Sequence, residues 1–167
     1  MNNMKRFPYF TPQPCLNGNP IPEPLPFTVE RTVRFEEVDL MAVLWHGHYA
    51  SYFEDARVAL GNFYDIGYQV MMQHSILAPV RQMYVDYRAP LVFDERCTIT
   101  ALLHWSEAAR LNLSYLIKNQ AQEIVATGYS VQMFIDARRK LMLEQPTFLH
   151  DFYQRWKSGA VAGVNLA

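Results

Sequence analysis

The sequence contains one long segment with helical periodicity and five segments with the pattern of β-strands. This arrangement constrains the fold more than any other feature of the chain. Side chains on one face of a helix recur every three or four residues. Between residues 46 and 66 that spacing holds over about five turns, and it stops near Gly67. The residues that share this face are His46, Tyr49, Ala50, Phe53, Arg57, Leu60 and Tyr64.

Alternating apolar and polar residues predict the strands. In the run 27–35, Phe27, Val29, Val33 and Phe35 share a buried face, and Arg31 is its single polar exception. Four further runs follow the helix, at 77–89, 97–105, 109–119 and 123–137. Because short connections join them, we expect these four strands as antiparallel neighbours. A short amphipathic helix is predicted at 146–157, with Pro146 in its first turn.

A single sheet must cover its apolar face, and only the helix at 46–66 is long enough to do so. The predicted fold class is therefore α+β: a curved five-stranded antiparallel sheet wrapped around one long central helix, which is the hotdog fold. We expect this domain to span residues 27–158, followed by a frayed tail at 159–167.

The first 26 residues form a different kind of segment, because they hold seven of the ten prolines. Proline lacks an amide donor and favours extended backbone before it, so residues 1–26 are predicted to be an extended arm. The arm carries Phe7, Tyr9 and Phe10, and we expect it to dock on a protein surface.

Composition excludes several classes of function. The formal net charge of −1 gives no positive field for nucleic acid. No apolar run approaches the roughly 18 to 20 residues that span a bilayer, and the N-terminus lacks a signal-peptide pattern. Cys15 and Cys97 cannot form a disulfide framework. We expect a soluble, cytoplasmic protein.

The segment between the first strand and the helix carries the candidate chemistry. Asp39 lies seven residues before His46, and the residues between them are mostly apolar. A carboxylate in such surroundings is costly to bury without a partner. No Ser, Thr, Asp or Asn stands directly before His46 to cap the helix, so its first N–H groups are predicted to be open to a ligand.

These residues resemble the hotdog-fold acyl-CoA thioesterases of the 4-hydroxybenzoyl-CoA thioesterase type. That family has a strand ending in Asp, a short loop, His or Tyr and then Tyr, and an acidic residue followed by Ala-Arg. The resemblance covers about residues 28–140. The matching positions are Asp39, His46, Tyr49, Glu54, Ala56, Arg57 and the Tyr87-x-x-Pro90 pair. The chain departs from the family at Ala42, where the loop usually has Gly.

The resemblance implies hydrolysis of a thioester. Asp39 would act as nucleophile or general base, and an N–H beside His46 would polarise the thioester carbonyl. Tyr49, Glu54 and Arg88 would bind substrate, with Arg88 and the run 136–140 near coenzyme A phosphates. Each has a structural alternative: a loop-capping Asp39, a packed His46 or Tyr49, a Glu54–Arg57 pair, and a solvated hairpin at 136–140.

No cofactor is expected beyond the coenzyme A of the substrate. A metal site is not expected either, because His46 and His48 diverge by about 200° on a helix. The substrate carrier is coenzyme A or, alternatively, acyl carrier protein. Other hotdog functions also remain open: a dehydratase or hydratase, whose Asp–His spacing is commonly five rather than seven, or a non-catalytic acyl-binding protein. Since an open sheet leaves edges exposed, we expect a homodimer, with a tetramer as a further step.

Overall fold

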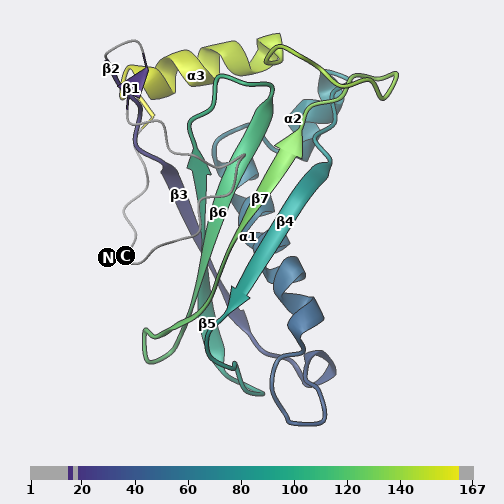
Figure 1. Cartoon of the computed structure of the whole chain (residues 1–167), viewed down its shortest axis with the longest axis vertical. Helices are drawn as coiled ribbons and strands as arrows, with labels where there is room; N and C mark the ends of the chain where they lie inside the picture. The colour runs from purple at the N-terminus through teal and green to yellow at the C-terminus, as the bar shows by residue number, and fades with distance from the viewer. Residues whose placement is uncertain (1–14, 17–18, 162–167) are drawn as a thin grey trace.

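The structure is a computed structural model, and it describes residues 15–16 and 19–161 (Figure 1). The strands are β1 (Cys15–Leu16), β2 (Asn19–Pro20), β3 (Leu25–Thr32), β4 (Val80–Tyr87), β5 (Arg96–His104), β6 (Arg110–Asn119) and β7 (Ile124–Met133). The helices are α1 (Tyr49–Phe63), α2 (Tyr68–Gln73) and α3 (His150–Lys157). Short 3-10 helices are η1 (Phe35–Glu37), η2 (His46–His48) and η3 (Thr147–Leu149).

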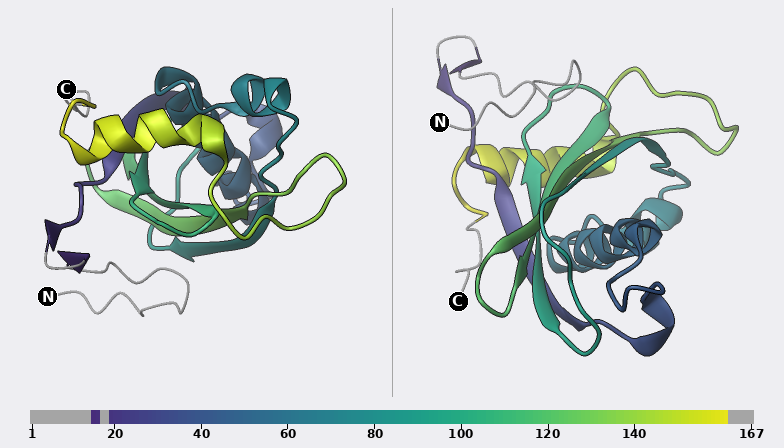
Figure 2. Two further views of the ribbon diagram at one scale, coloured as in Figure 1. Left: turned by 90° about the horizontal axis from the view of Figure 1, so that it is seen from above. Right: turned by 60° about the horizontal axis from the view of Figure 1, so that its bottom comes forward.

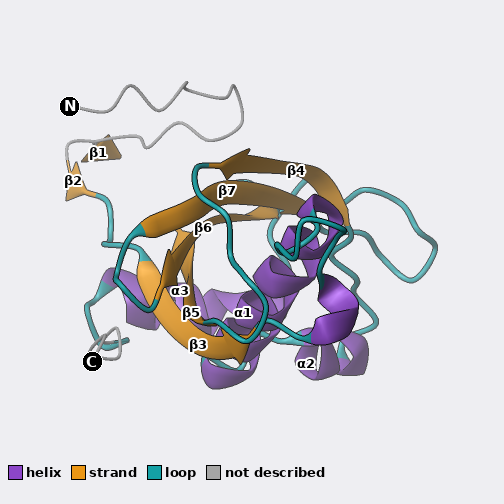
Figure 3. Cartoon of the chain, turned by 90° about the horizontal axis from the view of Figure 1, so that it is seen from below, coloured by secondary structure: helices purple, strands orange, loops and turns teal. Residues whose placement is uncertain are grey.

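The main sheet has five antiparallel strands in the order β3-β5-β6-β7-β4. It curves around α1, which lies against its concave face (Figures 2 and 3). This confirms the predicted hotdog architecture. The alternation of the sequence explains which face of the sheet meets the helix, since every second residue of β5 and β6 is buried.

The core forms where α1 meets the middle strands. Phe53 of α1 is fully buried and stacks on Tyr115 of β6, with ring centroids 4.4 Å apart. Gly128 of β7 allows this close approach, because a Cβ there would lie 2.4 Å from the Phe53 ring. Phe53 therefore fixes the distance between the helix and the sheet.

β4 and β5 were predicted to be antiparallel neighbours, but they do not pair with each other. β5–β6 and β6–β7 are adjacent as expected, but β4 pairs with β7 and β5 pairs with β3. Residues 88–95 instead cross the end of the sheet. Pro90 interrupts the strand pattern, and Asp94 turns the chain with a left-handed φ of 63°. The crossing segment consequently runs beside the loop that follows β3.

The predicted first strand ends earlier than expected. Phe35 was assigned to the buried face, yet it is 79% exposed and begins η1, where its ring packs edge-on against Phe93. The cause is Glu37, whose carboxylate accepts the amide of Arg34 at 2.9 Å and closes a 3-10 turn. The helix α2 was also missed, since six residues are too few to show a helical period.

The described end of the arm packs against the C-terminal helix. β3 begins at Leu25 rather than residue 27, and Pro26 is tolerated because β3 is an edge strand. The indole of Trp156 in α3 donates to the carbonyl of Glu23 at 2.9 Å. The arm aromatics Phe7, Tyr9 and Phe10 lie outside the described residues. In the part of the chain that is described, no helix is long and apolar enough to cross a bilayer.

Candidate active site

Asp39 begins a tight turn between β3 and the helical segment. Its amide donates to the carbonyl of Val43 at 2.9 Å, and its own carbonyl accepts the amide of Ala42 at 2.9 Å. The carboxylate oxygen Oδ1 accepts the amide of Met41 at 2.8 Å. Within the described residues Oδ2 has no hydrogen-bond partner. One oxygen therefore holds the loop, and the other is available to a substrate or a water.

Ala42 explains how the turn forms without the glycine that the family usually has there. Its backbone is left-handed, with φ of 59°. Alanine reaches this region at a cost of roughly 1 kcal/mol, whereas glycine reaches it freely. Ala42 thus supplies the left-handed residue that this turn requires.

The start of the helical segment is uncapped. No side chain caps η2 or α1. The amide of His48 donates to the carbonyl of Trp45 at 2.9 Å, while those of His46 and Gly47 have no partner among the described residues. The ring of Trp45 lies so close to Gly47 that a Cβ there would come within 2.1 Å of it. Two donors at the positive end of a helix are therefore open, as the sequence predicted.

A pocket of about 370 Å³ lies between this helix start and the end of β4. It brings together four of the five predicted site residues, Asp39, His46, Tyr49 and Arg88; the structure does not test their roles. The remaining lining residues are Met41, Val43, Leu44, Tyr87, Ala89 and Pro90.

The polar groups of the pocket differ in their chemistry. Burial raises the pKa of Tyr49 to about 12, so its phenol stays protonated at neutral pH and can donate but not act as a base. Arg88 is partly exposed and pairs with Asp86 at 3.1 Å. Its charge therefore lies at the rim of the pocket, where an anionic group of a ligand could meet it.

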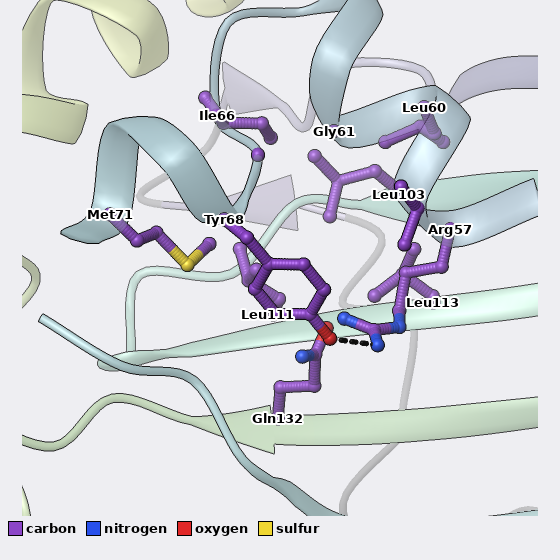
Figure 4. A pocket seen from close by; sticks show the side chains of 12 residues that line it. Arg57, Leu60, Gly61, Ile66, Tyr68, Met71, Leu103, Leu111, Leu113 and Gln132 are labelled. Atoms are coloured by element: carbon purple, nitrogen blue, oxygen red, sulfur yellow. Dashed lines mark hydrogen bonds between the residues drawn. The ribbon is translucent and has the colours of Figure 1, made fainter. Parts of the chain in front are cut away.

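Glu54 lies elsewhere. It forms an ion pair with Arg57 and accepts a hydrogen bond from the hydroxyl of Tyr68 at 3.1 Å. Arg57, together with Tyr68, lines a second, far smaller cavity of about 20 Å³ between α1, α2 and the sheet (Figure 4). The Glu54–Arg57 pair, which the sequence analysis gave as the structural alternative for Glu54, is thus present. Glu54 does not line the Asp39 pocket.

The basic run at 136–140 also lies away from this pocket in a single chain. It is a hairpin in which the Asp136 carboxylate accepts the amides of Arg138 and Lys140 at 2.8 and 2.9 Å. The hairpin follows the end of β7, whereas the pocket lies at the end of β4. Since these two strands are antiparallel, the two features are at opposite ends of the sheet (Figure 1).

Glu37 is a supporting residue that the sequence analysis did not identify. It is only 5% exposed, and its carboxylate accepts hydrogen bonds from Arg31 at 2.8 Å and from the hydroxyl of Tyr52 at 2.9 Å. Its carbonyl accepts the amide of Trp45 at 2.9 Å. Glu37 therefore ties β3 and α1 to the residue before His46. The signal for it was Arg31, a cation on the buried face of a strand, which requires a nearby anion.

The donor set of the described chain does not suit a metal ion. Within residues 15–16 and 19–161, no three His, Cys, Asp or Glu side chains are grouped as metal ligands. The pocket instead combines the Asp39 carboxylate with an exposed His46, which begins the uncapped helical segment. In such a set the carboxylate can deprotonate a water or attack as the nucleophile itself, and backbone amides can stabilise an oxyanion.

Comparison with known proteins identifies the family of the chain. Residues 33–156 match the family described as the thioesterase-like superfamily. The chain belongs to this superfamily. That membership confirms the predicted class, a thioester hydrolase with the hotdog fold, while the 4-hydroxybenzoyl-CoA type remains a prediction.

Individual relatives agree with this assignment. YneP of Bacillus subtilis (strain 168), by its name a candidate acyl-CoA thioesterase, is 26% identical over 107 residues, covering 64% of this chain and 78% of that protein. The acyl-CoA thioester hydrolase YbgC of Escherichia coli O157:H7 is 30% identical over 67 residues, covering 40% of this chain and 50% of that protein. The DHNA-CoA thioesterase structure from Staphylococcus aureus has a TM-score of 0.68 at 25% identity, covering 81% of this chain and 89% of that one.

Proposed function

We propose that the protein hydrolyses acyl-CoA thioesters to a free acid and coenzyme A. The observation that carries this proposal is the pocket in which the Asp39 carboxylate lies with the uncapped helix start at His46. The family match and the names of the relatives support the substrate class. The motif of the chain resembles that of the 4-hydroxybenzoyl-CoA thioesterase type, and the aromatic lining of the pocket would suit an acyl or aryl group.

In the proposed mechanism the amides of His46 and Gly47 polarise the thioester carbonyl. Their partial positive charge stabilises the oxyanion that develops on the carbonyl oxygen. Asp39 either removes a proton from the attacking water or attacks the acyl carbon itself. In both routes a C–O bond to the acyl carbon forms, the C–S bond breaks, and the thiolate of coenzyme A leaves and takes up a proton. If Asp39 is the nucleophile, water then hydrolyses the mixed anhydride, which releases the free acid and restores the Asp39 carboxylate.

The remaining site residues have supporting roles in this proposal. His46 contributes its backbone and positions the loop, and Tyr49 lies under the acyl group as a neutral hydrogen-bond donor. Arg88 at the rim would meet a phosphate of coenzyme A. The proposed site needs no metal and no cofactor beyond the coenzyme A of the substrate.

We also propose a homodimer, with a tetramer as a further level of assembly. β4 and β3 are the two edges of the sheet, and an unpaired edge favours pairing with a second copy. Pairing along β4 would place a partner beside Tyr87 and the pocket. A cytoplasmic location is part of the same proposal, since coenzyme A thioesters are metabolites of that compartment.

The test is hydrolysis by the full chain of short, long and aromatic acyl-CoA substrates, with the released thiol measured directly. We expect turnover with at least one of these three substrate classes, and the class that is hydrolysed fastest identifies the acyl specificity. The same acyl groups on acyl carrier protein provide the comparison for the carrier. Absence of turnover with every acyl-CoA would overturn the proposed function.

A further inference from the structure

The Tyr87-x-x-Pro90 motif has no role in the chemistry described so far, yet its segment runs beside the helix start. The amide of Leu44 donates to the carbonyl of Leu91 at 2.7 Å, and Val43 bridges to Val92. At the other end of this contact, the hydroxyl of Tyr87 donates to the carbonyl of His46 at 3.0 Å. The segment 87–92 therefore supports residues 43–46 along their length.

The backbone and ring of Tyr87 are themselves held in place. Tyr87 pairs with Ala126 at the end of β4. The two amides that follow it, of Arg88 and Ala89, both donate to the carbonyl of Val125, at 2.9 and 3.2 Å. The Tyr87 ring packs edge-on against Tyr49, with centroids 4.9 Å apart. The hydroxyl thus comes from the rigid sheet, although the side chain is half-exposed.

The acceptor of this bond belongs to a peptide that matters for the site. The carbonyl of His46 and the amide of Gly47 form one planar unit, so fixing the carbonyl also fixes the direction of the Gly47 N–H. A hydrogen bond to a peptide carbonyl polarises that peptide and makes its N–H a stronger donor. The Gly47 amide has no partner among the described residues, and it directly follows His46, which lines the pocket.

We propose that Tyr87 is a positioning residue of the thioester site, acting through the His46–Gly47 peptide. Its hydroxyl orients and polarises the Gly47 amide, which serves as an oxyanion donor beside His46. The catalytic part of this inference rests on the proposed thioesterase function. The hydrogen bond and its effect on the peptide do not.

A spectroscopic test addresses the peptide directly. His46–Gly47 is the only His–Gly pair in the sequence. Labelling histidine carbonyl carbons with ¹³C and glycine amides with ¹⁵N therefore selects a single amide resonance in NMR. Tyr87→Phe should shift both the His46 carbonyl and the Gly47 amide, because it removes the hydroxyl and keeps the ring. Tyr84→Phe, on the same strand but outside the pocket lining, should leave them unchanged. An unshifted Gly47 resonance in Tyr87→Phe would overturn the proposal, whether or not the chain hydrolyses any thioester.

Kinetics test the catalytic part. With the best acyl-CoA substrate, Tyr87→Phe should lower kcat by about three- to tenfold, in the range expected for one hydrogen bond, and leave KM nearly unchanged. Tyr84→Phe should retain the wild-type kcat. If the substitution only reduced stability, the melting temperature would fall, but kcat would not fall selectively while KM stayed unchanged. A wild-type kcat in folded Tyr87→Phe would overturn the role, whereas inactivity of the wild type itself would count against the proposed function.

Discussion

The amide of Ala42 donates to the carbonyl of Asp39 at 2.9 Å, and this bond closes the turn that carries the candidate catalytic carboxylate. The turn requires a left-handed backbone at Ala42, where φ is 59°. An alanine in this conformation stores strain next to the site, and the strain can be measured by substitution.

Ala42→Gly should leave the turn intact and raise the free energy of unfolding by at most about 1 kcal/mol, since glycine adopts the left-handed region freely. Ala42→Val should lower it, because a β-branched residue is a marked outlier at this φ. Denaturant unfolding of the wild type and the two variants measures the order of their free energies of unfolding. A valine variant as stable as the wild type would show that the backbone here is not left-handed.

Glu37→Gln should reduce stability by roughly 1–3 kcal/mol at pH 7, because it removes the buried one of the two carboxylates that pair with Arg31 and leaves a hydrogen-bond network imperfectly satisfied. Glu36→Gln is the matched control. The Glu36 side chain is 68% exposed and only weakly paired, so little change is expected. Equal effects of the two substitutions would contradict the role of Glu37.

Acid sensitivity provides a second readout of the Glu37 substitution. Burial alone would raise the pKa of Glu37, but hydrogen bonds from the Arg34 amide and Tyr52 hydroxyl, with the charge of Arg31, lower it overall. A lowered folded-state pKa gives stability above the unfolded value of 4.5, and that stability is lost as pH falls through the folded value. The difference between wild type and Glu37→Gln should therefore shrink as pH falls below about 4.5. If the difference in the free energy of unfolding between the two proteins did not change with pH, the lowered pKa of Glu37 would be contradicted.

His104 should make the protein less stable in mild acid. Burial lowers its pKa to about 4, against an ordinary value of 6.5. Between these values the unfolded chain binds a proton that the native chain does not, so stability should fall as pH decreases from 6.5 to 4. NMR titration of the His104 ring, assigned with His104→Gln, measures the pKa directly. A midpoint near 6.5 would contradict the burial of this side chain.

The assembly should have at least twice the 19.4 kDa mass of one chain at micromolar concentration, as measured by light scattering. Because β3 begins at Leu25 and Glu23 is bound by Trp156, deletion of residues 1–20 is the appropriate truncation. If the arm supports only the second level of assembly, this variant should be a dimer. A fully active protein with the mass of one chain would rule out an obligate dimer.

The sequence predicts the fold well where its periodicity is long. The α1 pattern and the alternation of β5 and β6 each extend over nine residues or more, and tertiary packing agrees with them. It fails where a local hydrogen bond decides the structure. The Arg34–Glu37 turn ends β3 and exposes Phe35, which no alternation pattern predicts. The pairing of β4 with β7 depends on the path of residues 88–95 and not on strand length.

The candidate site shows the same division. Asp39 and His46 could be selected from the sequence because they match the motif of the thioesterase family that the chain resembles. The Tyr87-x-x-Pro90 motif could also be recognised, but the hydrogen bond from Tyr87 to His46 could not be predicted, since 41 residues separate the two and only the fold brings them together. Glu54 shares a helix with Tyr49, but it pairs with the buried cation of Arg57 and does not line the Asp39 pocket.

The central claim is that Asp39 carries the chemistry of a thioesterase, and kcat of Asp39→Asn with the best acyl-CoA substrate tests it most directly. Asparagine keeps the volume of the side chain and its bond to the Met41 amide, so the variant should fold normally and bind substrate with nearly unchanged affinity. Loss of a nucleophile or general base should lower kcat by about 10²-fold or more. Near-native turnover in a folded Asp39→Asn variant would contradict the account.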